Sequence, residues 1–92
     1  MRIFWSLAAQ TDLDRIHNFQ ARNDLDAAAA VLDALVDAPE ALLDFPRRGS
    51  RLGEFDPREV REFRTRSYLV RYELGPRDLF VLRLFHVRED RF

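Results

Sequence analysis

The sequence contains no cysteine and no lysine, and each absence removes a class of chemistry. Without cysteine there can be no disulfide framework, no thiolate metal site and no thiol nucleophile. Without lysine, the only ammonium group is at the N-terminus, and every other cationic contact falls to the fifteen arginines. Because guanidinium groups favour forked contacts with carboxylates and phosphates, the positions of the arginines are central to any functional interpretation.

Other signals are also missing. The opening MRIFWSLAAQ has too short an apolar run for a membrane-spanning helix and lacks the central region of a signal peptide, so we expect a cytoplasmic protein. There is no glycine-rich phosphate loop, no nucleophile elbow and no serine triad. The two histidines, His17 and His86, have no carboxylates at metal-ligand spacing, so we expect neither a metal nor a cofactor.

The charges are present in nearly equal numbers but are unevenly distributed. Residues 1–46 carry three arginines and eight acidic residues, whereas residues 47–92 carry twelve arginines and eight acidic residues. The net charge of the whole chain is only −1. The second half is therefore the part of the chain that would meet an anionic partner.

The first half is predicted to contain one strand followed by two helices. Residues 2–6 are short, aromatic and apolar, which predicts a strand, and Ser6 is a suitable N-cap for a helix. Apolar residues recur at helical spacing over residues 7–22, and an alanine run begins a second helix over residues 25–37. Because about two residues join the helices, they must form an antiparallel hairpin. Three charged residues are expected on the polar side of the first helix: Asp12, Asp14 and Arg15.

The second half changes to an apolar period of two, which predicts strands over residues 60–66, 68–74 and 79–87. One face of the middle strand is expected to be apolar: Tyr68, Val70, Tyr72 and Leu74. The last strand is apolar on both faces except at Arg83, which is typical of a central strand.

Before these strands, Pro39 predicts a kink or a new helical turn. Residues 45–59 are expected to form one long loop, and such loops are often functional.

Together these elements predict an α+β fold in a single domain, residues 1–92. We expect the three strands to form an antiparallel meander and the first strand to join the same sheet. The helical hairpin should then cover one face of that sheet.

The strand arginines have two interpretations. Because side chains on neighbouring strands lie about 5 Å apart across a face, Arg71 and Arg83 would form a cationic patch if their faces coincide. In the alternative, cross-strand pairs neutralise the arginines: Glu59, Glu62 and Glu73 against Arg61, Arg64 and Arg71. Arg83 needs its own explanation, since a charge in an apolar strand is costly to bury unless it is paired. His17 is expected at the core boundary, and His86 could be a general acid or base.

The order of elements and three segments resemble the RelE/ParE superfamily of bacterial toxins from type II toxin–antitoxin modules. FPRRGSR (residues 45–51) resembles its proline–glycine–arginine loop after the second helix. VREFRTRSYLVRYEL (60–74) resembles its arginine-rich strand and the tyrosine-containing strand after it. VLRLFHVRED (81–90) resembles its last strand, which ends in a histidine and arginines. The resemblance covers nearly the whole chain.

The resemblance implies one of two activities. RelE-like members cleave mRNA on the ribosome without a metal, whereas ParE-like members inhibit DNA gyrase. The net charge of −1, the missing lysines and the few residues after His86 favour the ParE-like interpretation, because binding among RNA phosphates needs many cationic contacts. No catalytic residue is then expected, whereas a nuclease would use Arg64, Arg83 and His86. A non-toxic regulatory or stabilising protein of the same fold is a third interpretation.

The resemblance also implies two partners, a cognate ParD-like antitoxin and DNA gyrase. The antitoxin would bind a groove of the toxin through a C-terminal segment, and an acidic segment would be attracted to the basic loop at Arg47, Arg48 and Arg51. The candidates for target binding are Arg83, His86 and Arg88. Neither membrane contact nor sequence-specific nucleic-acid binding by the toxin alone is expected.

Overall fold

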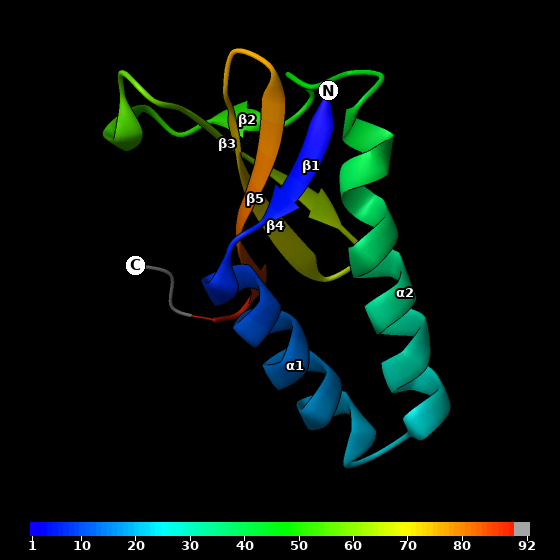
Figure 1. Cartoon of the computed structure of the whole chain (residues 1–92). Coiled ribbons are helices and arrows are strands. Elements are labelled where there is room, and N and C mark those ends of the chain that lie inside the picture. The colour runs from blue at the N-terminus through cyan, green and yellow to red at the C-terminus, as the bar shows by residue number, and fades with distance from the viewer. Residues whose placement is uncertain (90–92) are drawn as a thin grey trace.

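The computed structural model describes residues 1–89 and has the predicted α+β architecture. A helical hairpin packs against one side of a five-stranded sheet (Figure 1). The elements are β1 (Arg2–Trp5), α1 (Leu7–Ala21), α2 (Leu25–Leu42), β2 (Ser50–Arg51), the 3₁₀ turn η1 (Gly53–Phe55), β3 (Glu59–Thr65), β4 (Tyr68–Leu74) and β5 (Asp78–His86). None of the helices in this part of the chain is both long and apolar enough to span a bilayer.

The sheet has the strand order β1-β5-β4-β3-β2. The predicted antiparallel meander is confirmed as β3, β4 and β5, and β1 joins the same sheet parallel to β5. Strand β5 is therefore internal, as its apolar pattern indicated. However, β1 pairs only with Asp78 to Val81, so the second half of β5 has no neighbouring strand on that side.

Both helices begin at a side-chain cap, and the first of these is the predicted Ser6. The Ser6 hydroxyl accepts a hydrogen bond from Ala9 N, and the Asp24 carboxylate accepts two from the first turn of α2. The second helix is longer than predicted, because it continues through Pro39 to Leu42 without a new start. Pro39 removes one backbone hydrogen bond, but Ala38, Pro39 and Leu42 are all buried, and this apolar burial offsets the loss.

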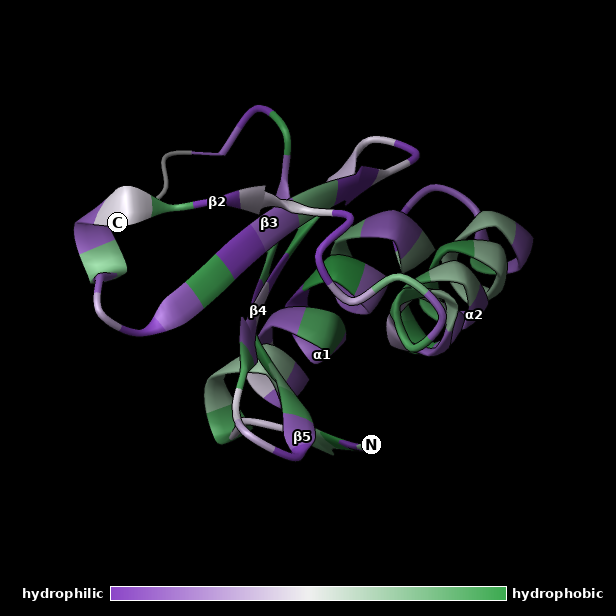
Figure 2. Ribbon diagram, turned by 90° about the horizontal axis from the view of Figure 1, so that it is seen from above, coloured by the Kyte–Doolittle hydropathy of each residue, from purple (hydrophilic) through white to green (hydrophobic). Residues whose placement is uncertain are grey.

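The core lies between the helices and one face of the sheet. The predicted inner face of β4 is confirmed, since all four of its apolar side chains are buried: Tyr68, Val70, Tyr72 and Leu74. They pack against Leu79, Val81 and Leu84 of β5 and against Ile16, Leu35 and Leu42 of the helices. Strand β3 is mostly polar, with Val60 and Phe63 as its two apolar residues, and Figure 2 shows it largely in purple.

A β-bulge in β5 decides which side chains reach which face. Tyr72 lies opposite Val81 but Arg71 lies opposite Arg83, so Leu82 is an extra residue in the ladder. The inward positions therefore shift from Leu79 and Val81 to Leu84, with His86 on the same face. Arg83 and Phe85 consequently share the opposite face with Arg71.

The segment after α2 is more structured than a single loop. It contains the edge strand β2, where Ser50 pairs with Glu62 and Arg51 with Arg61, and then η1. The prediction of one continuous loop over residues 45–59 was therefore wrong. A two-residue strand cannot be recognised from an apolar period, because its pairing depends on β3 rather than on its own side chains.

Candidate functional site

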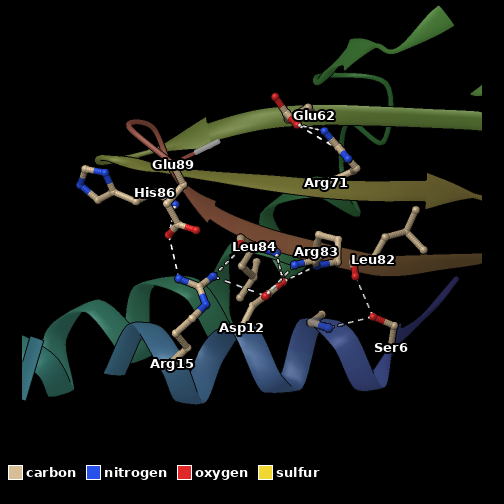
Figure 3. A network of polar contacts seen from close by, with 11 residues as sticks. Ser6, Asp12, Arg15, Glu62, Arg71, Leu82, Arg83, Leu84, His86 and Glu89 are labelled. Atoms are coloured by element: carbon tan, nitrogen blue, oxygen red, sulfur yellow. Dashed lines mark hydrogen bonds and ion pairs between the residues drawn. The ribbon is translucent and has the colours of Figure 1, made fainter. Parts of the chain in front are cut away.

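The unpaired half of β5 is covered by α1 instead of by a strand. At Ser6 the chain leaves β1, and α1 then runs along the edge of β5 (Figure 3). Ser6 N donates to Val81 O at 3.0 Å and the Ser6 hydroxyl donates to Leu82 O at 2.7 Å. The N-cap residue of the helix thus satisfies backbone groups that a further strand would otherwise bond, which protects this edge of the sheet.

Asp12 is the main contact between α1 and this edge. Its side chain is only 5% exposed, and it accepts hydrogen bonds from Arg83 Nε at 2.7 Å, Arg83 Nη2 at 3.0 Å and Leu84 N at 2.9 Å. Arg15 Nη2 adds a longer contact at 3.4 Å. The prediction that Asp12 lies on the polar side of the first helix was wrong, because Asp12 lies on the buried face with Ala9 and Ile16.

The ionisation of Asp12 is stabilised by these donors. Burial by itself raises the pKa of a carboxylic acid, but the hydrogen bonds from Arg83 and from Leu84 N outweigh that effect, so the pKa of Asp12 is lowered. The same contact with Asp12 raises the pKa of Arg83. Both groups are therefore charged at neutral pH, and the ion pair connects α1 to β5.

The ion pair explains why an arginine interrupts the apolar strand. Arg83 and Arg71 are cross-strand neighbours, as one interpretation required, but neither guanidinium is left unneutralised. Arg83 reaches over the edge to Asp12, and Arg71 pairs with Glu62 at 3.2 Å. Both guanidinium groups also lie over the Phe85 ring, 4.9 and 5.1 Å from its centroid.

Cross-strand neutralisation, which holds for Arg71 and Glu62, does not hold for the other two strand arginines of the prediction. Arg61 pairs at 2.8 Å with Glu59 of its own strand, β3, and Glu73 pairs with Arg58 rather than with a strand arginine. Arg64 differs, because its Nε donates to the Arg66 carbonyl at 2.8 Å and no carboxylate within residues 1–89 pairs with it.

His86 lies at the end of β5 in an open pocket of about 670 Å³ between β4, β5 and α1. Its ring meets the Tyr68 ring edge to face at 5.3 Å. The Tyr68 hydroxyl accepts a hydrogen bond from Gln20 at 2.9 Å. The pocket is lined by the apolar residues Ile16, Phe19 and Tyr68 and by four polar residues, Arg15, His86, Arg88 and Glu89.

Glu89 closes one side of this pocket. Its Oε1 accepts from Arg15 Nη1 at 2.8 Å and from His86 N at 3.1 Å, and this contact raises the pKa of Arg15 (Figure 3). Arg88 N donates to His86 Nδ1 at 3.2 Å, which assigns the proton of the neutral imidazole to Nε2. The Nδ1 of His86 is therefore occupied by a backbone donor.

The three residues predicted for a nuclease are not brought together. His86 faces the helices, whereas Arg64 is aligned through Leu69 with Phe85 and so lies on the opposite face of the sheet. Arg83 is engaged with Asp12 at the edge. Of the candidates for target binding, His86 and Arg88 share the pocket, and Arg83 supports the strand beside it.

The basic loop is held against the sheet by Tyr72 and Arg61. The Tyr72 hydroxyl donates to Pro46 O at 2.7 Å and accepts from Gly49 N at 2.9 Å, and Arg61 Nη1 donates to Gly49 O at 2.7 Å. Burial raises the pKa of Tyr72, although the hydrogen bond from Gly49 opposes this. The hydroxyl therefore remains a neutral donor and acceptor that fixes the path of the loop.

The three loop arginines have different surroundings. Arg47 forms a forked pair with Glu59, at 2.9 and 3.0 Å, and Arg51 pairs with Asp56 at 3.0 Å. Arg48 instead stacks over the Phe63 ring, 5.9 Å from its centroid. Only Arg48 of the three has no carboxylate partner within residues 1–89.

Replacing Tyr72 with phenylalanine tests whether the hydroxyl holds this loop. We expect a loss of about 2 kcal/mol in the free energy of unfolding, because the buried Gly49 N–H would lose its partner. Chemical denaturation at neutral pH measures the change. Tyr68→Phe is the matched control and should cost less than about 1 kcal/mol, since Gln20 is partly exposed and can bond to water. Equal losses in the two variants would contradict the assignment.

The site includes residues that the sequence alone did not indicate. Asp12, Arg15 and Glu89 form the contacts around β5, and Phe19, 61% exposed, borders the pocket. The one available signal was the spacing of Asp12 with Ala9 and Ile16, which places all three on one helical face. Nothing in the sequence indicated Glu89, because its contacts depend on the turn after β5.

Comparisons with known proteins agree with this architecture. The profile of the family described as "ParE toxin of type II toxin-antitoxin system, parDE" matches residues 3–91. The chain is 31% identical over 89 residues to "Putative toxin Y4kP" of Sinorhizobium fredii (strain NBRC 101917 / NGR234), covering 97% of this chain and 91% of that protein. The fold is similar to a chain in the structure "Chromosomal ParDE TA system from P. aeruginosa", with a TM-score of 0.73, 16% identity and coverage of 94% and 95% of the two chains.

Proposed function

Because the chain belongs to the ParE toxin family of type II toxin–antitoxin systems, we propose that it stops cell growth by inhibiting DNA gyrase and that it is not a nuclease. The observation that supports the absence of nuclease activity is the arrangement around His86. Its Nδ1 is bonded to Arg88 N, Arg83 is paired with Asp12, and Arg64 lies on the other face of the sheet. Metal-independent RNA cleavage needs a base and a phosphate-binding cation side by side, and the predicted set of Arg64, Arg83 and His86 does not supply that arrangement.

The target-binding surface in this proposal is the pocket around His86 and Arg88. It is lined by both apolar and polar side chains, which is the composition of an anchoring site for a protein side chain. Arg83 acts indirectly, because its pair with Asp12 holds the strand that carries His86.

The proposal includes a ParD-like antitoxin as the neutralising partner. The basic loop supports contact with an acidic segment, and Phe45 beside it is 70% exposed, which gives the same surface an apolar anchor. Arg48 would pair with an antitoxin carboxylate without losing a partner, whereas Arg47 and Arg51 would exchange Glu59 and Asp56 for it. We therefore expect Arg48 to contribute most of the charge contact.

A supercoiling assay with purified gyrase tests the proposed target. We expect the protein to inhibit supercoiling and the double variant His86→Ala, Arg88→Gln to be at least tenfold less potent. His17→Gln, which changes the partly exposed histidine of α1, should keep full potency.

A translating extract gives the decisive comparison. Cleavage of mRNA in that extract, with gyrase unaffected, would identify a RelE-like ribonuclease and refute the proposal. Absence of both activities in the folded protein would instead identify a non-toxic member of the family.

A further inference from the structure

The arginines within residues 1–89 fall into two groups. Eight pair with a carboxylate: Arg2, Arg15, Arg47, Arg51, Arg58, Arg61, Arg71 and Arg83. The other six have no such partner in this part of the chain: Arg22, Arg48, Arg64, Arg66, Arg77 and Arg88. The distinction matters because a paired guanidinium contributes little to the surface potential, whereas an unpaired one contributes its full charge.

Four of the unpaired arginines lie at one end of the sheet, and we call them the arginine arc: Arg48, Arg64, Arg66 and Arg88. Arg48 and Arg64 line the same pocket of about 400 Å³. Arg64 bonds to the Arg66 carbonyl, and Arg66 occupies the β3–β4 turn. Ser67 of that turn accepts from Val87 N at 2.9 Å, which places Arg88 beside it.

The guanidinium groups of the arc remain available to a ligand. All four residues are exposed. Among residues 1–89, Arg64 donates only through its Nε, which leaves both of its terminal nitrogens to a ligand, and Arg48 contacts the Phe63 ring without a carboxylate partner. Of the acids near the arc within residues 1–89, Glu62 is paired with Arg71 and Glu89 with Arg15, and Asp44 lines a pocket with Arg48 at one end of the arc.

We infer that the arginine arc binds the phosphodiester backbone of a nucleic acid without reading its sequence. Guanidinium forks match phosphate oxygens, and a row of them follows a repeating polyanion. A peptide would in addition need apolar anchors within the surface. The apolar side chains that line the pocket shared by Arg48 and Arg64 are only partly exposed, and the exposed Phe45 and Phe19 lie in the pockets at the two ends of the arc.

The near-neutral composition does not oppose this inference. The net charge of −1 counts acids that are distributed over the whole molecule, with eight of them in residues 1–46. Binding depends instead on the local potential at one end of the sheet. A contact of this kind would bring the protein to nucleic acid independently of its protein target, and an antitoxin that covers Arg48 would weaken it.

Fluorescence anisotropy with a 20-base-pair labelled duplex of arbitrary sequence tests the inference, in parallel with single-stranded DNA and RNA of equal length. With four phosphate contacts on duplex DNA, the logarithm of affinity should fall with the logarithm of salt with a slope of about −3.6. The triple variant Arg48→Gln, Arg64→Gln, Arg88→Gln should retain a slope of about −0.9 and bind at least tenfold more weakly at 50 mM salt. The ligand that binds most tightly identifies the preferred nucleic acid.

A matched control removes the same charge elsewhere. Arg2, Arg58 and Arg77 lie at the opposite end of the sheet, near the β4–β5 turn and the start of β3, and all three are exposed. The triple variant Arg2→Gln, Arg58→Gln, Arg77→Gln should bind like the unchanged protein, with circular dichroism confirming that both variants are folded. If both triple variants lost the same affinity, the effect would be one of net charge and the inference would be overturned. Absence of binding to all three nucleic acids at 20 mM salt would also overturn it. Because the anisotropy assay contains no gyrase, neither result affects the proposal that gyrase is the target, which the supercoiling assay tests separately.

Discussion

Replacing Asp12 with alanine is expected to lower the free energy of unfolding by about 3 kcal/mol, one of the largest effects of any single substitution in this fold. The change removes both hydrogen bonds to Arg83 and leaves the Leu84 N–H without its acceptor. A larger destabilisation is not expected, because the Arg83 side chain is 39% exposed and can be hydrated once Asp12 is removed. For a domain of this size the melting temperature should fall by more than about 10 °C.

Acid should have a related effect in the unchanged protein. The pKa of Asp12 is lowered in the folded state, so the stabilisation from this group is fully present above the unfolded value of about 4 and is lost as the pH falls below it. Thermal melts between pH 7 and pH 2 should show this loss. In Asp12→Asn, which keeps the size of the side chain, the loss below pH 4 should be smaller.

Two further variants make the Asp12 prediction specific. Asp14→Ala lies on the exposed side of the same helix and should change stability by less than about 0.5 kcal/mol. Arg83→Ala leaves a buried carboxylate with fewer donors and should destabilise the protein almost as much as Asp12→Ala. If Arg83→Ala abolished growth arrest while leaving the melting temperature unchanged, Arg83 would be a direct target contact and its positioning role would be refuted.

A second large effect is expected from Gly49→Ala, which should cost about 3 kcal/mol. A methyl group at this position would lie 2.7 Å from the Tyr72 hydroxyl oxygen and 2.9 Å from the Glu62 carbonyl oxygen, well inside contact distance. Neither atom can move freely, because Tyr72 is fully buried and Glu62 is part of the β3 ladder. The loop that carries Arg47 and Arg48 should therefore separate from the sheet, which would appear both as lower stability and as faster proteolysis near residue 49.

Gly53→Ala provides the comparison for Gly49. It lies only four residues later, but a methyl group there would approach nothing closer than the Asp56 carboxylate at 4.0 Å. We expect a change of less than about 0.5 kcal/mol. A similar loss of stability in both variants would mean that the close approach of Gly49 to Tyr72 is not the cause.

Much of the fold was predictable because its signals are local. Helix and strand periods place α1, α2, β3, β4 and β5, and Ser6 and Asp24 mark the two helix starts by side chains that bond to their own first turns. The alternation in β4 identifies its buried face, since neighbouring positions on a strand point to opposite sides. The central position of β5 followed from its apolar composition.

The site was less predictable, because its contacts join residues far apart in the sequence. Arg83 and Asp12 are separated by 71 positions, and the bulge at Leu82 turns His86 toward the helices. An arginine that forms an ion pair and an arginine that is solvated are the same residue in the sequence. The sequence therefore could not show which arginines are paired.

The sequence by itself determined the α+β class, the order of the elements and the surplus of arginine in the second half, because each depends on residue type and local spacing. Only the tertiary structure decided which arginines are neutralised. Packing α1 against the open half of β5 buries Asp12 beside Arg83, while the end of the sheet near Arg64 and Arg88 receives no carboxylate from residues 1–89 that is not already engaged by another arginine. The distribution of free charge is therefore a property of the packing, since an ion pair forms only where two side chains meet within about 4 Å.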